Sequence, residues 1–314
     1  MLYLMNARIA ISKYSIYPWL IVGWQITFTI LAIWLTLSKN MGAFIAGELL
    51  LSVSILQWFI LEHDFGHAAF FKSKWLNNVF GLLASLFSLL PFFPWKTIHH
   101  SHHVWTGWKD LDPTQPQKKI DDLSGTLIFI INTCWKLWIP IFSLGFSLLT
   151  FWNLKRLSTL YPKKKLVIQN ILSVVFIVFV FALLIIFFGG FMVKCWLPAF
   201  LMYMLIADPL LLSQHTHLDY HYAEGKDVKP IRYQLQPAYT RSVIYPNWMS
   251  TYLLYHFDKH GLHHQHPGVP LYKISQLSAP EENTIYWLKW LKIAKQIPAH
   301  VLIFQSYNNT GIKL

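Results

Sequence analysis

Long runs of apolar residues alternate with short polar segments along this 314-residue chain. A helix needs about 20 apolar residues to cross the hydrocarbon core of a bilayer. Four runs have about that length and carry one charged residue or none: Pro18–Ser38, Met41–Leu61, Leu166–Val193 and Cys195–Ser213. The first run is longer than the apolar part of a signal peptide, about 7–15 residues, so we expect it to be retained. Because the turns at Lys39–Asn40 and Gly189–Lys194 are short, the pattern predicts an all-α integral membrane protein with about four transmembrane helices in two hairpins.

Histidine-rich segments begin where apolar runs stop. HDFGH has the spacing H-x-x-x-H, both HHSHH and HGLHH contain H-x-x-H-H, and QHTH follows the last long apolar run. Residues i, i+3 and i+4 share a helix face, so each of the first three segments gathers two or three imidazoles. Imidazole is the commonest protein ligand of transition metals, and so many histidines are too many for one ion. The sequence therefore predicts a two-metal site. The predicted ligands are His63, His67, His99, His102, His103, His260, His263 and His264, with His215 as the ninth and His217 as its alternative.

Imidazole suits zinc, copper, iron and nickel, so the ligand type alone leaves the metal open. Zinc would serve hydrolysis or structure, and neither needs two sites of four or five histidines. A two-metal site beside a lipid phase favours iron, which can activate oxygen. Nearby carboxylates are expected to orient the imidazole rings rather than to bind metal. The side chains considered for that role are Asp64, Asp112, Asp219 and Asp258, together with His100, His217 and His256.

The remaining histidines fall outside the shared spacing. His221 and His266 are interpreted as loop residues, and His300 is given no role. The string His266–Pro267–Gly268 resembles a haem-binding motif, but it overlaps the third histidine segment and no haem domain follows it.

Two further apolar stretches are ambiguous. Asn77–Pro94 is marginal in length and ends in PFFP, and Gly125–Phe151 is interrupted by Lys136 and Pro140. The histidine segments can meet only if they lie on one face of the membrane, and a single crossing by either stretch would separate them. Each stretch is therefore predicted to be re-entrant or interfacial, or to cross an even number of times.

The distribution of basic residues indicates which face carries the histidines. Twelve Lys or Arg residues lie between Glu62 and Lys165 and ten lie after Ser213, whereas each short turn on the other side has one. Arg8 and Lys13 precede the first span. Since cytoplasmic loops are enriched in Lys and Arg, we expect a cytoplasmic, histidine-rich helical cap with both termini on the same side.

The overall composition agrees with a membrane protein. Apolar residues make up 54% of the chain and charged residues 13%, against roughly 25% charged residues in soluble domains. The net charge of +12 comes from bases that flank apolar runs, so anionic lipid is a better partner for them than nucleic acid. Cys134 and Cys195 offer neither a disulfide framework nor an iron–sulfur set. Because the segments share one set of histidines, residues 1–314 are predicted to form a single domain.

Near the C-terminus, Lys289, Lys292 and Lys295 recur every three residues among Trp and Leu side chains. This pattern predicts a helix over residues 284–298 that lies in the membrane interface. A helix packed against the cap explains the same pattern.

The three histidine segments resemble the histidine boxes of the membrane fatty acid desaturase family. WKTIHHSHHVWTGWKDLDP and HGLHHQHPGVPLYKI are similar to the regions around the family's second and third boxes, and QHTH is similar to an extra histidine segment of acyl-lipid desaturases. The resemblance covers roughly residues 40–280. It implies that the nine histidines His63, His67, His99, His102, His103, His215, His260, His263 and His264 bind two irons, which use molecular oxygen to remove hydrogen from an acyl chain.

The resemblance implies a fatty acyl substrate on a lipid, on coenzyme A or on a carrier protein. It also implies a separate electron donor, a ferredoxin or a small cytochrome, since no flavin, haem or iron–sulfur motif is visible here. The boxes leave open a hydroxylase or ketolase acting on fatty acyl, alkane or carotenoid substrates. A metal transporter is the alternative from another class, but transporters place their ligands near the bilayer midplane and show internal repeats.

Overall fold

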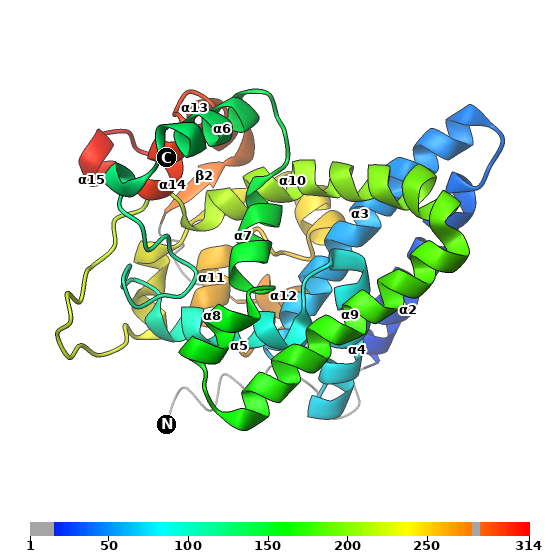
Figure 1. Ribbon diagram of the computed structural model, residues 1–314, viewed down its shortest axis with the longest axis horizontal. Helices are drawn as coiled ribbons and strands as arrows, with labels where there is room; N and C mark the ends of the chain where they lie inside the picture. The colour runs from blue at the N-terminus through cyan, green and yellow to red at the C-terminus, as the bar shows by residue number, and fades with distance from the viewer. Residues whose placement is uncertain (1–15, 278–282) are drawn as a thin grey trace. The chain divides into compact units, whose positions relative to one another are not determined.

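The computed structural model describes residues 16–277 and 283–314. Arg8 and Lys13, which contribute to the predicted sidedness, lie outside these residues. The described chain is mainly helical and contains two short strands (Figure 1). This confirms the prediction of an all-α protein.

The chain divides into two compact units, each made of two segments. The first unit comprises Met1–Thr97 and Gly145–Ile206, and the second comprises Ile98–Leu144 and Ala207–Leu314. Three helices contribute residues to both units: α5 (Phe92–Trp105), α7 (Phe142–Thr150) and α10 (Leu197–His215). The other elements of the first unit are α2 (Tyr17–Thr36), α3 (Met41–Gly66), α4 (Lys74–Ser88), α8 (Leu154–Leu160), α9 (Lys164–Phe191) and a π-helix at Met192–Trp196.

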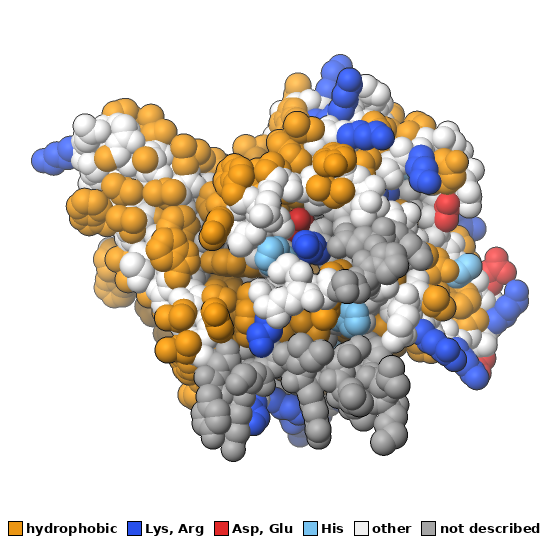
Figure 2. All heavy atoms as spheres, turned by 180° about the vertical axis from the view of Figure 1, so that it is seen from behind, with side chains coloured by type: hydrophobic (Ala, Val, Ile, Leu, Met, Phe, Trp, Pro, Cys, Tyr) orange, Lys and Arg blue, Asp and Glu red, His pale blue; other side chains and the backbone are white. Residues whose placement is uncertain are grey.

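Among the described residues, three helical stretches are long and apolar enough to cross a membrane: Tyr17–Thr36, Met41–Gly66 and Lys164–His215. The bent pair α4 and α5 makes a fourth if it is counted as one span. Large hydrophobic side chains such as Trp34 of α2 and Phe187 of α9 are more than half exposed. Figure 2 shows side chains of this kind gathered over a broad surface with few charged groups. Together these features identify a membrane protein.

A tight turn joins α2 to α3. The side chain of Asn40 accepts a hydrogen bond from the backbone N–H of Ala43, which caps the first turn of α3. Gly47 has no side chain, and a Cβ atom there would overlap the backbone at Leu35 and Thr36. The absence of a Cβ lets the two helices approach closely. The predicted turn at Lys39–Asn40 is confirmed.

The second predicted turn, Gly189–Lys194, differs from the structure. The helix continues through it, with a kink at Phe188 and the π-helix Met192–Trp196 leading into α10. The helical run Lys164–His215 has 52 residues, more than twice the about 20 that one span needs. In Figure 1 the ribbon changes direction sharply between α9 and α10. A π-bulge reverses the chain here without a loop, which hydrophobicity alone does not reveal.

The ambiguous stretch Asn77–Pro94 forms most of a bent helix pair. The axes of α4 and α5 differ by 103°, the geometry of a broken span or a re-entrant loop. Leu89 adopts a left-handed conformation at the bend, with φ of 53°. The hydroxyl of Ser88 donates to the buried carboxylate of Glu62 and accepts from the backbone N–H of Leu90. These hydrogen bonds provide partners for polar groups that have no helical partner at the bend.

The second unit holds shorter elements. The helices are α6 (Gly125–Lys136), α11 (His260–Gln265), α12 (Leu271–Ile274), α13 (Trp287–Ala294), α14 (Ala299–Phe304) and α15 (Tyr307–Thr310), and the strands are β1 (Ser242–Ile244) and β2 (Thr284–Tyr286). Short 3₁₀ segments lie at Ile120–Asp122 and Tyr233–Tyr239, and a second π-helix lies at Met249–Leu253. Within the described residues, neither α6 nor α7 is a candidate span, so Gly125–Phe151 contains no long membrane helix.

The C-terminal helix is shorter than predicted. Residues 284–286 form β2, which pairs in parallel with β1, and the helix α13 begins only at Trp287. Trp290 and Ala294 are buried in a core with Trp135 of α6. The ammonium group of Lys295 lies over the ring of Trp135 and donates to the carbonyl oxygen of that residue. One face of α13 therefore packs within the second unit, while Leu288 on another face is 60% exposed.

Candidate metal centre

Three helix ends carry the histidines of the second unit. His99, His102 and His103 lie in the last turns of α5, His215 is the last residue of α10, and α11 begins at His260. Spacing along each helix decides which rings stand together. Residues i and i+4 differ by about 40° around a helix axis, whereas i and i+3 differ by about 60° in the opposite sense. The histidines of one box can therefore point in two different directions.

The first of these places is a four-histidine group: His102, His215, His260 and His264. One ligand atom from each residue lies within 4.8 Å of the others. The Nε2 atoms of His215 and His260 are 2.7 Å apart, those of His102 and His215 are 3.2 Å apart, and those of His260 and His264 are 3.1 Å apart. Four nitrogen atoms from three helices thus face one point.

The second place is a three-histidine group: His99, His103 and His263. Nε2 of His103 lies 3.1 Å from Nε2 of His99 and 3.1 Å from Nε2 of His263. The second and third boxes are therefore each divided between the two groups. The sequence interpretation, in which all three histidines of a box converge, is too simple, because the residues at i+3 and i+4 point in directions that differ by about 100°.

The separations between nitrogen atoms match those around a first-row metal ion. Metal–nitrogen bonds of about 2.0–2.1 Å place two neighbouring ligand nitrogens about 3 Å apart when they meet the ion at a right angle. The Nε2 atoms of the four-histidine group are 2.7 to 3.2 Å apart along the chain of contacts. The residues present therefore fit a metal ion bound by imidazole.

Hydrogen bonds among the four rings cannot give every ring nitrogen a compatible partner. Nδ1 of His102 faces a carboxylate and Nδ1 of His264 faces an amide oxygen, so both carry their proton on Nδ1 and leave Nε2 bare. His215 and His260 would then each have to donate from Nε2. Those two nitrogens are only 2.7 Å apart, where two N–H groups repel each other. A cation at the centre removes the conflict, because it accepts four lone pairs at once.

The environment keeps the ring of His264 neutral. His264 is fully buried, and burial, followed by the neighbouring imidazoles of His103 and His260, lowers its pKa well below the usual range. A neutral imidazole is the form that binds metal. The ring of His264 is therefore suited to binding a cation.

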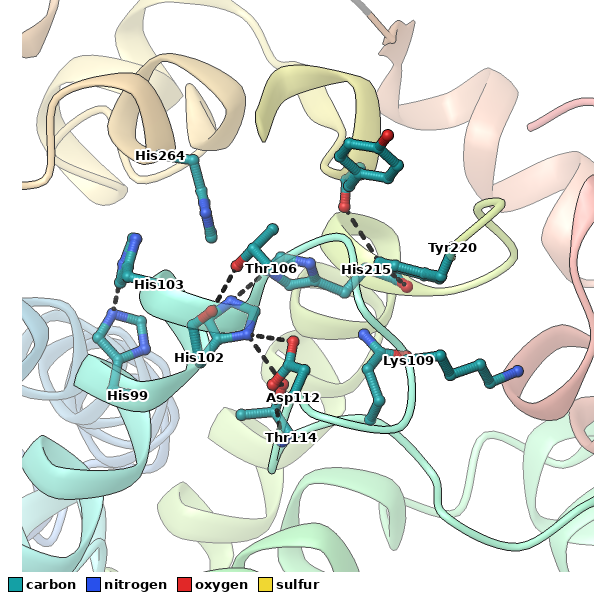
Figure 3. A network of polar contacts seen from close by, with 12 residues as sticks. His99, His102, His103, Thr106, Lys109, Asp112, Thr114, His215, Tyr220 and His264 are labelled. Atoms are coloured by element: carbon teal, nitrogen blue, oxygen red, sulfur yellow. Dashed lines mark hydrogen bonds and ion pairs between the residues drawn. The ribbon is translucent and has the colours of Figure 1, made fainter. Parts of the chain in front are cut away.

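Asp112, one of the carboxylates proposed to orient a ring, contacts His102. Its Oδ2 accepts a hydrogen bond from Nδ1 of His102 at 2.7 Å, and the carboxylate is fully buried (Figure 3). The other oxygen accepts from the backbone N–H and the hydroxyl of Thr114. A carboxylate fixed in this way sets both the tautomer and the direction of the ring, and second partners of this kind commonly matter for metal affinity.

Gln236 is a residue that sequence reasoning missed. Its side-chain oxygen accepts from Nδ1 of His264 at 3.0 Å, and its amide nitrogen donates to the carbonyl oxygen of His103 at 2.8 Å. The side chain is completely buried. It links a histidine of each group. No signal in the sequence marks it, since it lies 28 residues before His264 in a segment without helical periodicity.

Arg241 is a second such residue. Its guanidinium is 1% exposed and donates from Nη1 to the carbonyl oxygens of Ser213 and Thr216. Its backbone N–H donates to Gln214. Burial lowers the pKa of Arg241 to about 10, which leaves it charged at neutral pH. The guanidinium of Arg241 therefore stabilises the C-terminal end of α10, where His215 lies.

In the first unit, the first box lies at the end of α3. The rings of His63 and His67 meet edge to face with centroids 4.8 Å apart. Nδ1 of His63 lies 3.6 Å from a carboxylate oxygen of Asp64, and the ring of Trp95 is next to it. Gly66 makes room for Trp95, since a Cβ atom there would overlap the indole.

The remaining candidate residues take other positions. His100 is exposed. His217 is buried but shares a hydrogen bond with Thr310 of α15, and Asp219 accepts from the backbone of Asn308. Asp258 accepts from Ser250, which also contacts Nδ1 of His256.

The other histidines are also engaged away from the groups. His221 contacts the hydroxyl of Tyr239, and His300 contacts Asn132. His266 ends α11 as its C-cap residue. No group of metal-ligating side chains in the second unit's described residues includes any of these positions.

Comparison with known proteins gives a consistent result. The model of a family described as fatty acid desaturase matches residues 38–292. An sn-1 oleoyl-lipid 12-desaturase from a Picosynechococcus species is 26% identical over 239 residues, which cover 73% of this chain and 66% of that protein. The protein of the same name from a Synechocystis species is 25% identical over 224 residues, which cover 69% and 62%.

A shorter and closer match is to an sn-1 acyl-lipid omega-3 desaturase (ferredoxin) from a Nostoc species. It is 43% identical over 54 residues, which cover 17% of this chain and 15% of that protein. The chain matches less than two thirds of the length of each of these relatives.

Proposed function

Because this chain belongs to the fatty acid desaturase family, we propose that it is a membrane oxidoreductase that introduces a double bond into a fatty acyl chain with two iron ions and molecular oxygen. The observation that carries the proposal is the pair of all-imidazole groups in the second unit, whose nitrogen atoms have the spacing of metal ligands. Imidazole ligands suit iron as well as zinc, copper and nickel, and membership of the family favours iron among them.

The proposed ligand set has nine members. His102, His215, His260 and His264 would hold one ion. His99, His103 and His263 would hold the other, completed by His63 and His67. Three imidazoles leave a first-row ion short of the four to six ligands such ions take. The first box supplies two more, since His63 and His67 stand together at the end of α3.

The chemistry of the reaction explains why metal is needed. Methylene hydrogens of an acyl chain do not ionise, so acids and bases cannot remove them, and bound iron would supply the oxygen activation that can. The residues of this chain would position the metal ligands and exclude water from the site. Asp112 and Gln236 hold His102 and His264 in one tautomer. Burial of His102, His103, His260, His263 and His264 keeps water away from the reacting oxygen.

The overall reaction balances with an external reductant. Removing two hydrogens from neighbouring carbons yields two electrons and two protons. Reduction of one dioxygen molecule to two waters consumes four of each. The other two electrons come from a one-electron carrier, and two protons come from solvent. We propose a ferredoxin-class carrier, because a relative bears that donor in its name.

The substrate is proposed to be an acyl chain esterified to membrane lipid. Two relatives matched over most of the chain are named as oleoyl-lipid desaturases, and the first unit exposes large apolar side chains of the kind that would face lipid. We also propose a cytoplasmic position for the histidines, which the excess of Lys and Arg in the segments that flank them supports.

Lipid analysis tests the proposal. The full chain is produced in a host that lacks polyunsaturated acyl chains but has oleoyl lipids and reduced ferredoxin, and the fatty acids are profiled by mass spectrometry. New double bonds, lost in the His264→Ala variant, support the proposal. Hydroxylated chains would show a hydroxylase, and unchanged lipids with altered iron uptake would show a transporter. Either result overturns it.

A matched control uses a histidine outside both groups. His100 lies next to His99 in the sequence but is exposed. The His100→Ala variant is expected to keep its double-bond product and its iron content. If it loses both as His264→Ala does, the assignment of the ligands fails even though the activity stands.

A further inference from the structure

A line of rings in the second unit runs from an exposed loop to His215. The ring centroids of Trp108 and His221 are 5.4 Å apart, as are those of His221 and Tyr239. Tyr239 stacks on Tyr220 with centroids 6.3 Å apart. The hydroxyl of Tyr220 donates to the carbonyl oxygen of His215 at 2.9 Å. Each separation is within the roughly 4.5–7 Å range of aromatic rings in contact.

The backbone fixes the outer half of this line. Gly107 has φ of +99°, and a Cβ atom there would overlap Ile231 and crowd the ring of Tyr239. The carbonyl oxygen of Gly107 accepts from the N–H of His221, and the N–H of Lys109 donates to the carbonyl oxygen of His221. Two bonds therefore hold Trp108 beside His221, in an isolated parallel bridge.

Further bonds hold the loop and the inner half. Asp110 accepts from the backbone N–H groups of Ala223 and Glu224, both at 2.9 Å. The hydroxyl of Tyr239 and Nε2 of His221 share a hydrogen bond of 2.6 Å. The hydroxyl of Tyr220 also lies 3.1 Å from the carbonyl oxygen of Tyr239, so its single proton is shared between two acceptors. The rings therefore occupy fixed positions, although they belong to a segment with little regular structure.

The outer end of the line is accessible and carries both acids and bases: the exposed Glu224 pairs with Lys226, and Asp227 is also exposed. His221 is exposed, and the neighbouring Tyr222 is 56% exposed. The indole nitrogen of Trp108 donates to the carbonyl oxygen of Lys229. Lys229 and Arg232 are exposed, and neither takes part in an ion pair with the described residues. An acidic protein surface would supply the missing counter-charges.

We propose that Trp108, His221, Tyr239 and Tyr220 form the route by which an acidic one-electron carrier protein reduces the metal pair. The proposal rests on the proposed function, because a desaturase needs outside electrons. The carrier docks over Trp108 and His221, next to Lys229 and Arg232. Electron transfer weakens steeply with the gap between groups, so a line of contacting rings and one hydrogen bond to His215 offers a shorter path than packed aliphatic chains.

The electron balance of the step is simple. In each encounter one carrier molecule is oxidised by one electron, and one bound metal ion is reduced by one electron. No bond of the protein forms or breaks. Two encounters supply the two electrons that the proposed reaction requires. None of the four ring residues belongs to either histidine group, so they are positioning and conducting groups rather than ligands.

Stopped-flow mixing tests the route. The iron-loaded protein in lipid nanodiscs is mixed without oxygen with a reduced plant-type [2Fe–2S] ferredoxin, and oxidation of the ferredoxin is followed by absorbance. Replacing Tyr239 by Leu, or Trp108 by Leu, is expected to lower the rate of ferredoxin oxidation by at least about tenfold. Tyr239→Phe keeps the ring and is expected to stay within about threefold of the unchanged protein. Rates unchanged in both Leu variants, or equal losses in the Phe and Leu variants, overturn the route.

Controls separate this result from damage to the metal site. Each variant's iron content is measured, and its metal is also reduced by dithionite with methyl viologen, which needs no docking protein. Both readouts are expected to match the unchanged protein. Tyr252→Leu removes another exposed aromatic residue of the second unit and is expected to leave the ferredoxin rate unchanged. An equal loss in Tyr252→Leu contradicts the route.

Surface charge gives a second, independent readout. Lys229→Glu with Arg232→Glu is expected to slow the bimolecular rate and to weaken its dependence on salt, because fewer charges attract the carrier. An unchanged salt dependence overturns the docking surface. The proposed function fails separately, if the unchanged protein binds iron and accepts electrons but makes no double bond.

Discussion

The carboxylate of Asp112 accepts a hydrogen bond from Nδ1 of His102 over 2.7 Å, and both side chains are buried. Asp112 is nine residues beyond the last histidine of the second box and was expected from its position alone to orient a ring. The structure shows that it reaches one particular imidazole, whose other nitrogen faces the four-histidine group. The contact joins a loop after α5 to the metal centre.

Replacing Asp112 by Asn is expected to weaken metal binding by about 10–100-fold, the usual loss when the partner of a ligating histidine is removed. The amide keeps the size of the carboxylate but not its charge, so it holds the Nδ1 proton of His102 less firmly. Iron content after dialysis against graded chelator concentrations measures the effect. Asp121→Asn, at an exposed carboxylate, is the control and should bind iron normally. Equal affinities in the two variants would contradict this role for Asp112.

Gln236 is predicted to support both groups at once. Gln236→Leu removes the acceptor for His264 and leaves the buried carbonyl oxygen of His103 without this donor, at a cost of about 1–3 kcal/mol. Both the iron content and the free energy of unfolding should therefore fall. Gln236→Glu keeps an acceptor for His264 and should retain more iron than the Leu variant. Gln234→Leu changes an exposed amide two residues away and should alter neither quantity. Identical iron contents in the Leu and Glu variants would refute the proposed contact.

The helical spacing within each box could be predicted from the sequence, but the division of the boxes between two groups could not. His99 and His103 are at i and i+4 and stay together, as do His260 and His264, whereas His102 and His263 turn to the opposite group. That division depends on how α5, α10 and α11 are oriented around one another. A sequence pattern describes the face of one helix and contains no information about the rotation of its neighbours.

The transmembrane helices show the same limit of prediction from sequence. Apolar runs predicted α2, α3, α9 and α10 with useful accuracy, because burial in lipid requires long uninterrupted hydrophobic segments. The join between α9 and α10 was predicted as a loop but is a π-helix at Met192–Trp196. Residues 284–286 pair as β2 with residues 242–244, which lie more than 40 positions away in the sequence, and no local periodicity encodes that contact.

The guanidinium of Arg241 is predicted to be needed for stability, and a lysine is not expected to replace it fully. Arg241→Met leaves the carbonyl oxygens of Ser213 and Thr216 without their donor, and each buried acceptor left in this way costs about 1–3 kcal/mol. Lys carries the charge but has no planar pair of donors, so Arg241→Lys should recover only part of the loss. Chemical denaturation monitored by tryptophan fluorescence measures stability, and iron content reports on His215. Lys259→Met is the control for loss of a basic side chain. Full recovery by Lys would show that charge alone matters.

Gly66 is predicted to be indispensable for a steric reason. Ala favours helix over Gly by about 1 kcal/mol, so Gly→Ala inside a helix usually stabilises a protein. At Gly66, in α3, the added methyl group would overlap the indole of Trp95, which lies beside His63. Overpacking of a buried site costs about 1–3 kcal/mol, which exceeds the gain in helix propensity. Gly66→Ala should therefore lower both the unfolding free energy and the iron content.

Gly145 provides the matched comparison for Gly66. It lies within α7, and a Cβ atom there would meet nothing within 4 Å. Gly145→Ala should therefore keep its iron and gain up to about 1 kcal/mol, because only the helix propensity changes. The two variants carry the same chemical substitution and differ only in what surrounds it. If both gain stability, Trp95 has room to move and the packing beside His63 is looser than the structure indicates. If only Gly66→Ala loses iron, the contact between Gly66 and Trp95 fixes the position of the first histidine box.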